Sequence, residues 1–208
     1  MHQTAYDTGR FFFQIYWQPG FSRILDVGSQ DVNGTLRPIA PPAANYTGVD
    51  LVAGPGVDLV LTDPYSYPFV PGSFDCIVST SCFEHDDMFW LTFSEMCRVL
   101  KSDGFIYINA PSSGVYHGFP RDCWRFYPDS GIALEKWGRR MSHDISLVES
   151  FQFDGTEGHF RDFVMVFAGS GASVPSRSLR DEVQSIYATV NARVGSSGEL
   201  IAPKVAIS

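Results

Sequence analysis

Cysteine, positive charge and long apolar runs are all scarce in this 208-residue chain. The four cysteines, Cys76, Cys82, Cys97 and Cys123, form no C-x-x-C pair, which argues against a disulfide framework and against a zinc site. No apolar run approaches the ~20 residues of a membrane span, and the N-terminus lacks the basic and apolar segments of a secretory signal. We therefore expect a soluble, cytoplasmic protein with no membrane partner and no metal.

Acidic residues outnumber basic ones, with 23 Asp and Glu against 15 Lys and Arg and a net charge of -8. The field of such a protein repels polyanions, which excludes nucleic acid as a partner. Apolar residues, by contrast, make up 44% of the chain, enough for one domain with a full core.

One stretch organises the chain, the sequence RILDVGSQDVNG at residues 23–34. Ile24, Leu25 and Val27 indicate a buried strand, and Gly28 follows where the backbone must turn sharply or let a ligand come close. In a parallel sheet such a loop lies at the carboxyl end of the first strand. This is the edge at which α/β proteins bind their cofactors.

The following segments alternate between strands and helices. Helices are predicted at 86–100 and 129–140, and strands at residues 46–50, 57–61, 73–79 and 105–109. This alternation predicts an α/β fold with helices on both faces of a parallel sheet. The Pro-rich residues 38–42 favour a loop over a helix. Asp50 ends the second strand, where an acid can accept hydrogen bonds from both ribose hydroxyls of a nucleotide.

Both ends of the chain carry further segments. The helix predicted at residues 4–17 is apolar around most of its circumference, so it either packs on the sheet or forms a lid over the cofactor. We divide the chain into this N-terminal segment (1–20), a central domain (21–168), and a linker, helix and tail (169–208). The C-terminal helix has an apolar stripe that either the parent domain or a second copy in a homodimer must cover, formed by Leu179, Val183, Ile186, Tyr187 and Val190.

Together these motifs resemble the class I S-adenosylmethionine-dependent methyltransferases, in particular the type 11 group. The matching pieces run in the family's order, and they are LDVG at 25–28, GVD at 48–50, Asp63 before PFVPGSFD at 68–75, FEH at 83–85 and RVLKSDG at 98–104. The resemblance implies a Rossmann-like sheet of seven strands, mostly parallel, whose last two strands form an antiparallel hairpin. Residues 147–153 and 162–168 are well placed to form that hairpin.

The resemblance also implies S-adenosylmethionine as the cofactor. Gly28, Ser29 and Gln30 would line its methionine part. Asp50 would hold the ribose hydroxyls and Asp63 the adenine amino group, since carboxylates accept hydrogen bonds from such donors. Further cofactor contacts are implied by position for Asp26, Asn33, Leu51, Thr62, Pro64 and Ser81.

The chain departs from the family pattern in two places. Gln30 and Val32 stand where the family has glycines, so the loop takes another course, with a turn at Asn33–Gly34. Pro64 follows Asp63 and has no N–H to offer adenine. A nicotinamide-dependent oxidoreductase is the less favoured alternative, because its G-x-G-x-x-G loop needs glycine at positions 30 and 33.

The loop at residues 110–128 follows the fifth strand, so its polar and aromatic side chains lie at the ligand end of the sheet. We predict that His117 is the general base, or else orients the acceptor, and that Asp122 supports it. His85 is the second candidate base. The predicted substrate contacts are Tyr116, Arg121, Trp124 and Arg125. Alternatively, the aromatic residues pack on the sheet and the arginines form a surface ion-pair cluster around Asp122.

The motifs thus predict an enzyme that transfers the methyl group of S-adenosylmethionine to an oxygen or nitrogen of a small polar acceptor. The pattern from His117 to Phe126 is similar to methyltransferases encoded with bacterial glycan and secondary-metabolite genes, which indicates a sugar or a related precursor. The alternative from another class is a partner or sensor protein that binds S-adenosylmethionine without catalysis. Such a protein has no need of a base at His117.

Overall fold

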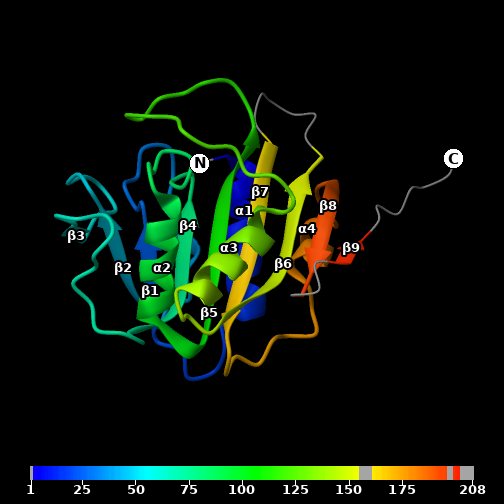
Figure 1. Cartoon of the computed structure of the whole chain (residues 1–208), viewed down its shortest axis with the longest axis horizontal. Helices are drawn as coiled ribbons and strands as arrows, with labels where there is room; N and C mark the ends of the chain where they lie inside the picture. The colour runs from blue at the N-terminus through cyan, green and yellow to red at the C-terminus, as the bar shows by residue number, and fades with distance from the viewer. Residues whose placement is uncertain (1, 155–160, 196–198, 202–208) are drawn as a thin grey trace, which may run out of the picture.

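The computed structural model describes residues 2–154, 161–195 and 199–201. They form one nine-stranded sheet with helices on both faces (Figure 1). In the order β3-β2-β1-β4-β5-β7-β6-β8-β9, its strands are Leu59–Val60, Asn45–Asp50, Arg23–Val27, Phe74–Thr80, Leu100–Ser113, Arg161–Gly169, Ile145–Phe153, Thr189–Val194 and Glu199–Ile201. The helices are α1 (Gln3–Tyr16), α2 (Phe89–Val99), α3 (Ser130–Arg140), α4 (Leu179–Val183) and the 3₁₀ turn η1 (Arg37–Ile39). Among these residues, none of the helices combines the length and apolar character that crossing a bilayer requires.

The sheet confirms the predicted fold class. Strands β1 to β5 pair in parallel, and β7 lies antiparallel between β5 and β6, as expected for the final hairpin. Two strands beyond the predicted seven, β8 and β9, extend the β6 edge. The Pro-rich connection between β1 and β2 contains only the three residues of η1, because proline has no N–H to continue a helical hydrogen-bond pattern.

Helix α1 belongs to the core and lies on the face of the sheet opposite α2 and α3 (Figure 1). The Phe12 and Tyr107 rings stack with centroids 5.0 Å apart, and the Tyr16 ring lies 5.0 Å from that of Phe105. On its other side the helix contacts the C-terminal segment, where the Tyr187 hydroxyl donates to Asp7 at 2.8 Å. Its apolar circumference is thus covered on two sides, and each fully buried aromatic side chain contributes about 1.5 to 3 kcal/mol. Of the two alternatives for this helix, the structure shows the core helix.

The C-terminal helix is shorter than the sequence predicts. It ends at Val183, and Thr189–Val194 form β8, which pairs antiparallel with β6. Tertiary context overrides the helical spacing here, because the backbone groups along the β6 edge need hydrogen-bond partners. Leu179 and Val183 are fully buried in the core beside α1, so the chain itself covers these two residues of the predicted dimerisation stripe.

Asp75 joins the starts of β1 and β4. Its carboxylate accepts hydrogen bonds from the backbone N–H groups of Ser22 (2.9 Å) and Arg23 (2.8 Å) and from Lys101 Nζ (2.5 Å). Burial opposes the charge, but these donors outweigh it and hold the pKa of Asp75 below its ordinary value. A depressed pKa adds stability that is present above the unfolded-state pKa and is lost as the pH falls through the folded-state pKa.

We expect Asp75→Asn to lower the free energy of unfolding at pH 7 by about 1 to 1.5 kcal/mol, because amide oxygen makes weaker hydrogen bonds than carboxylate. Denaturant unfolding from pH 7 down to pH 3 measures the difference between variant and wild type. That difference should shrink below about pH 4, near the ordinary pKa of an aspartate. Asp103→Asn, at an exposed position, is the matched control. An equal loss in both variants would contradict the role of Asp75.

Candidate functional site

The loop after β1 is fastened to β2 at the carboxyl edge of the sheet. The N–H groups of Gly28 and Ser29 both donate to Val49 O, at 3.0 and 3.1 Å. Gly28 has φ +76°, and a Cβ at this position would lie 2.5 Å from Cys82 Sγ. Only glycine satisfies both the left-handed backbone and this close approach. Cys82, in the segment after β4, had no predicted role.

The loop after β1 accommodates Gln30, where the family has glycine, because Gly54 in the loop after β2 has no side chain at the place where Gln30 contacts it. A Cβ on Gly54 would lie 2.6 Å from Gln30 Nε2, and one on Gly48 would lie 2.6 Å from Ser29 Oγ. Both side chains therefore pack against β2 and the loop that follows it. The chain then turns at Asn33–Gly34, where Gly34 N–H donates to Asp31 Oδ1 at 2.7 Å. Asn33 itself is exposed.

Asp50 lies beside this loop at the end of β2. Its Oδ2 accepts from Gln30 N–H at 3.0 Å and its Oδ1 from Leu51 N–H at 2.7 Å. Oδ1 also accepts from Val52 N–H at 3.4 Å, so three of the four lone pairs of the carboxylate are used and one remains for a ribose hydroxyl. Leu51 and Val52 are 54% and 58% exposed, which gives an apolar surface next to the acid. An acid beside exposed apolar side chains fits the ribose and adenine of a nucleoside.

The remaining predicted cofactor residues have different surroundings. Thr62 and Asp63 are exposed, and Asp63 accepts from Tyr65 N–H at 2.8 Å, which fixes its carboxylate beside Pro64. Ser81 is exposed at the end of β4 with φ +51°. Asp26, however, is buried and accepts from the Tyr46 hydroxyl at 2.8 Å, and burial raises its pKa to about 7. Asp26 thus lies apart from the exposed nucleoside surface.

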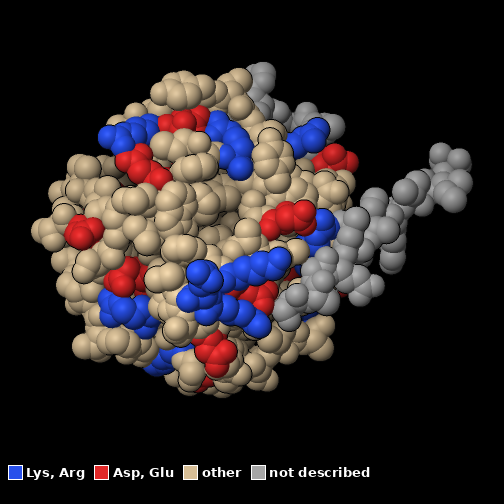
Figure 2. Space-filling model, in the orientation of Figure 1, with Lys and Arg blue, Asp and Glu red and all other residues tan. Residues whose placement is uncertain are grey.

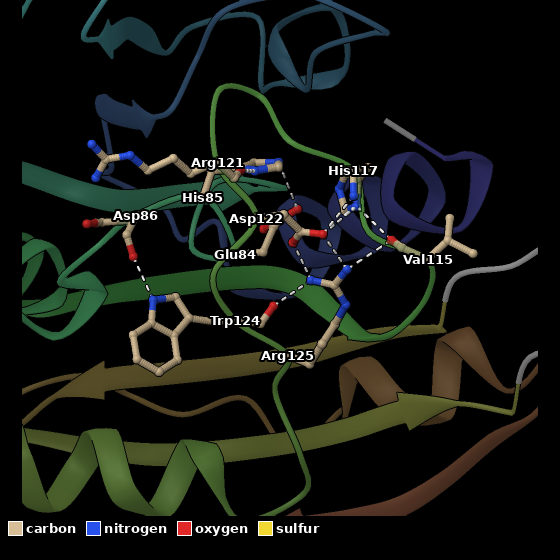
Figure 3. Close-up of polar contacts among 9 residues, drawn as sticks. All are labelled: Glu84, His85, Asp86, Val115, His117, Arg121, Asp122, Trp124 and Arg125. Atoms are coloured by element: carbon tan, nitrogen blue, oxygen red, sulfur yellow. Dashed lines mark hydrogen bonds and ion pairs between the residues drawn. The ribbon is translucent and has the colours of Figure 1, made fainter.

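The loop of residues 114–128 folds back over the segment that follows β4 (Figure 3). The N–H groups of Cys123 and Trp124 donate to Glu84 O at 2.6 and 3.2 Å, and His85 Nδ1 is hydrogen-bonded to Arg121 O. These contacts bring the two candidate bases together. The His85 and His117 rings meet edge to face with centroids 5.1 Å apart.

Asp122 contacts His117 through both the backbone and the side chain of the histidine. Its Oδ2 accepts from His117 N–H at 2.8 Å and lies 3.3 Å from His117 Nδ1. Arg125 binds both carboxylate oxygens of Asp122, and these hydrogen bonds hold the pKa of Asp122 well below its ordinary range. Asp122 therefore stays ionised and holds the His117 segment in place.

Glu84 is a third member of this site that the sequence interpretation missed. It is buried, and its Oε1 lies 3.7 Å from His85 Nε2. Burial raises the pKa of Glu84 to about 8. Its position next to His85 was the only sequence signal, and that signal does not say whether the side chain turns inward.

The predicted substrate residues divide into two kinds. Tyr116 is 78% exposed and open to a ligand. Trp124 instead donates from Nε1 to Asp86 O at 2.8 Å and packs edge to face on Phe89, and Arg125 is bonded to Asp122. Arg121 is exposed but paired with Asp87. Arg125 is thus paired with Asp122, as the ion-pair alternative expects, whereas Arg121 pairs with Asp87 and Trp124 packs on α2 and not on the sheet.

Charged side chains on this face gather over the loop after β5 and over the end of α3, among other places, and uncharged surface lies between these two (Figure 2). Arg139, in the last turn of α3, is bonded to Glu135, Ile145 O and Ser146. The arginines of the loop and those of α3 therefore do not form one continuous anion site.

Comparison with known families identifies the fold. Residues 25–108, which contain Gly28, Asp50 and Glu84, match the family model described as a methyltransferase domain. This match identifies a methyltransferase domain in the chain, and the sheet has the fold of the class I methyltransferases. S-adenosylmethionine is therefore the cofactor of this methyltransferase, and the nicotinamide alternative falls. The exposed acids and apolar residues at the ends of β2 and β3 fit its nucleoside.

Solved structures share the fold of this methyltransferase at low identity. A 1,6-didemethyltoxoflavin N1-methyltransferase from Burkholderia thailandensis, with bound S-adenosylhomocysteine, is 14% identical with a TM-score of 0.61, covering 81% of this chain and 79% of that chain. The YcgJ protein of Bacillus subtilis is 12% identical with a TM-score of 0.59, covering 81% and 99%. The [4+2]-cyclase SpnF is 13% identical with a TM-score of 0.58, covering 79% and 81%. No curated protein sequence matches the chain.

Proposed function

We propose that this methyltransferase methylates an oxygen or nitrogen of a small polar acceptor, a sugar or a related glycan or secondary-metabolite precursor. One observation carries the proposal. His85 and His117 meet beside Glu84 at the carboxyl ends of β4 and β5, only a short segment away from Cys82, which packs over Gly28. An acceptor held at the histidines would therefore lie close to the cofactor loop.

The chemistry asks little of the protein beyond alignment. The acceptor's lone pair forms the new bond to the methyl carbon while the carbon–sulfur bond breaks, and the acceptor loses a proton. Asp50, Leu51 and Asp63 would hold the nucleoside side of the cofactor. The His85–His117 site would orient the acceptor and take up its proton, and alignment of this kind accounts for much of the rate of a bimolecular transfer.

The surroundings of the site support a polar acceptor. Tyr116 offers an exposed aromatic face, and the two histidines supply hydrogen-bonding groups beside it. A protein that only sensed S-adenosylmethionine would need no such polar site across from the cofactor loop, which favours catalysis over the sensor alternative. All four cysteines lie among the described residues and are free thiols, which supports our proposal that the enzyme acts in the cytoplasm.

Release of S-adenosylhomocysteine in the presence of sugars, amines and phenols tests this proposal. We expect turnover with at least one hydroxyl or amine compound and none with apolar compounds of the same size. The same reactions without acceptor provide the background. Binding of the cofactor in a one-to-one ratio with no turnover across the panel would instead favour the non-catalytic alternative.

A further inference from the structure

Glu84, His85 and His117 bring three potential metal ligands to one point. One ligand atom from each of these side chains lies within 4.8 Å of the other two. Figure 3 shows the three residues converging beneath the loop that follows β5. Two imidazoles and one carboxylate form a donor set that suits first-row divalent ions such as Zn²⁺, Co²⁺, Mn²⁺ and Fe²⁺.

Both histidines have the outer contacts that metal-binding histidines usually make. His85 Nδ1 is bonded to the carbonyl of Arg121, and His117 Nδ1 lies 3.2 Å from the carbonyl of Val115. A carbonyl oxygen only accepts, so each of these bonds requires the proton on Nδ1 and leaves the lone pair on Nε2. Backbone carbonyls fix the tautomer of metal-ligating histidines in the same way.

Glu84 provides an independent observation. Its side chain is 1% exposed, and its buried Oε2 has no hydrogen-bond partner among the described residues. A buried carboxylate oxygen without a partner is costly, and a bound cation would offset that cost. The two nearby arginines are bonded to other carboxylates, Arg125 to Asp122 and Arg121 to Asp87.

We propose that Glu84, His85 and His117 bind one divalent transition-metal ion on the acceptor side of the cofactor loop. Donor atoms that each lie about 2.1 Å from one ion are about 3 to 3.5 Å apart, so His117, whose side chain is 36% exposed, moves inward on binding. This inference extends the proposed function. The ion's open positions would take an acceptor oxygen or nitrogen, whose proton is then lost more easily, and the histidines would serve as ligands.

Metal titrations of the full chain, after treatment with a chelator, test the site without any acceptor. We expect one Zn²⁺ per chain by calorimetry and Co²⁺ absorption bands that Zn²⁺ removes. Glu84→Gln keeps the shape of the buried side chain, and with His117→Ala it should weaken Zn²⁺ binding more than about 100-fold, beyond the 10- to 100-fold loss typical of an outer contact. His143→Ala and Cys123→Ser are matched controls and should bind as wild type, because His143 lies elsewhere, bonded to Ser94, and the Cys123 thiol contacts Asp87.

Several outcomes would overturn the metal site. Binding that survives in both Glu84→Gln and His117→Ala, or that is lost in Cys123→Ser, would place the ion elsewhere. Full methyl transfer by chelator-treated protein that binds no Zn²⁺ would leave His117 as a direct base and would leave the proposed function intact. Zn²⁺ binding with no turnover on any acceptor would sink the proposed function and keep the metal site.

Discussion

His117→Ala is expected to lower the rate of S-adenosylhomocysteine formation by about 10²- to 10⁴-fold, the usual share of a group that manages a proton in the transition state. The affinity for the cofactor should change little, because in the proposed function His117 acts on the acceptor, whereas Asp50, at the end of β2, holds the nucleoside. The loss should appear in kcat and in kcat/KM together, as for an interaction made in the transition state. Single-turnover kinetics with the best acceptor of the panel measures it.

His143→Ala is the matched control, since His143 is bonded to Ser94 at 2.7 Å on another part of the molecule. Its rate should equal that of the wild type. A loss of cofactor binding in His117→Ala would make the side chain structural, through its Nδ1, which lies 3.3 Å from Asp122 Oδ2 in the loop. An unchanged rate would remove His117 from the chemistry and leave His85 as the candidate.

Asp50→Ala is expected to weaken S-adenosylmethionine binding by about 1.5 to 3 kcal/mol, the range for hydrogen bonds to a charged group. The carboxylate also holds the N–H groups of Gln30 and Leu51, so the substitution removes both the ribose acceptor and the support of the cofactor loop. Calorimetry with S-adenosylhomocysteine gives the affinity and the one-to-one ratio.

Asp31→Ala separates these two effects. Asp31 also supports the loop, through the Gly34 N–H, but it has no predicted contact with ribose. We expect its affinity to stay within a few-fold of the wild type. Equal losses in the two variants would assign the effect of Asp50 to the shape of the loop and not to the ribose.

Local patterns predicted most of the architecture. The strand before Gly28, the amphipathic helix α3 and the hairpin of β6 and β7 all occur close to their predicted positions, because alternation and helical spacing report which side chains one element buries. The C-terminal segment was different. The apolar spacing from Leu179 to Val190 predicted one helix. Thr189–Val194 instead form a strand that pairs with the β6 edge, whose backbone groups need hydrogen-bond partners.

The candidate site was predictable in its parts but not in its geometry. His85, His117 and Asp122 were expected to act near the ligand edge because of their residue types and positions. Their contacts depend on the loop of residues 114–128. The backbone of this loop donates to Glu84 O and accepts a hydrogen bond from His85, and any residue provides such backbone atoms. Because residue type does not specify these bonds, the contact between the two histidines could not be predicted from the sequence.

The sequence by itself determined the seven predicted strands of the sheet and the resemblance to the methyltransferases, because Gly28, Asp50 and the periodic apolar residues act through local backbone and burial preferences. Only the tertiary structure decided that Arg125 is bonded to Asp122, that Asp26 is buried under Tyr46, and that Glu84 turns inward toward two histidines. These outcomes depend on which groups meet across the fold. The residue type of a charged side chain does not indicate whether the side chain is exposed to water or bonded to a buried partner.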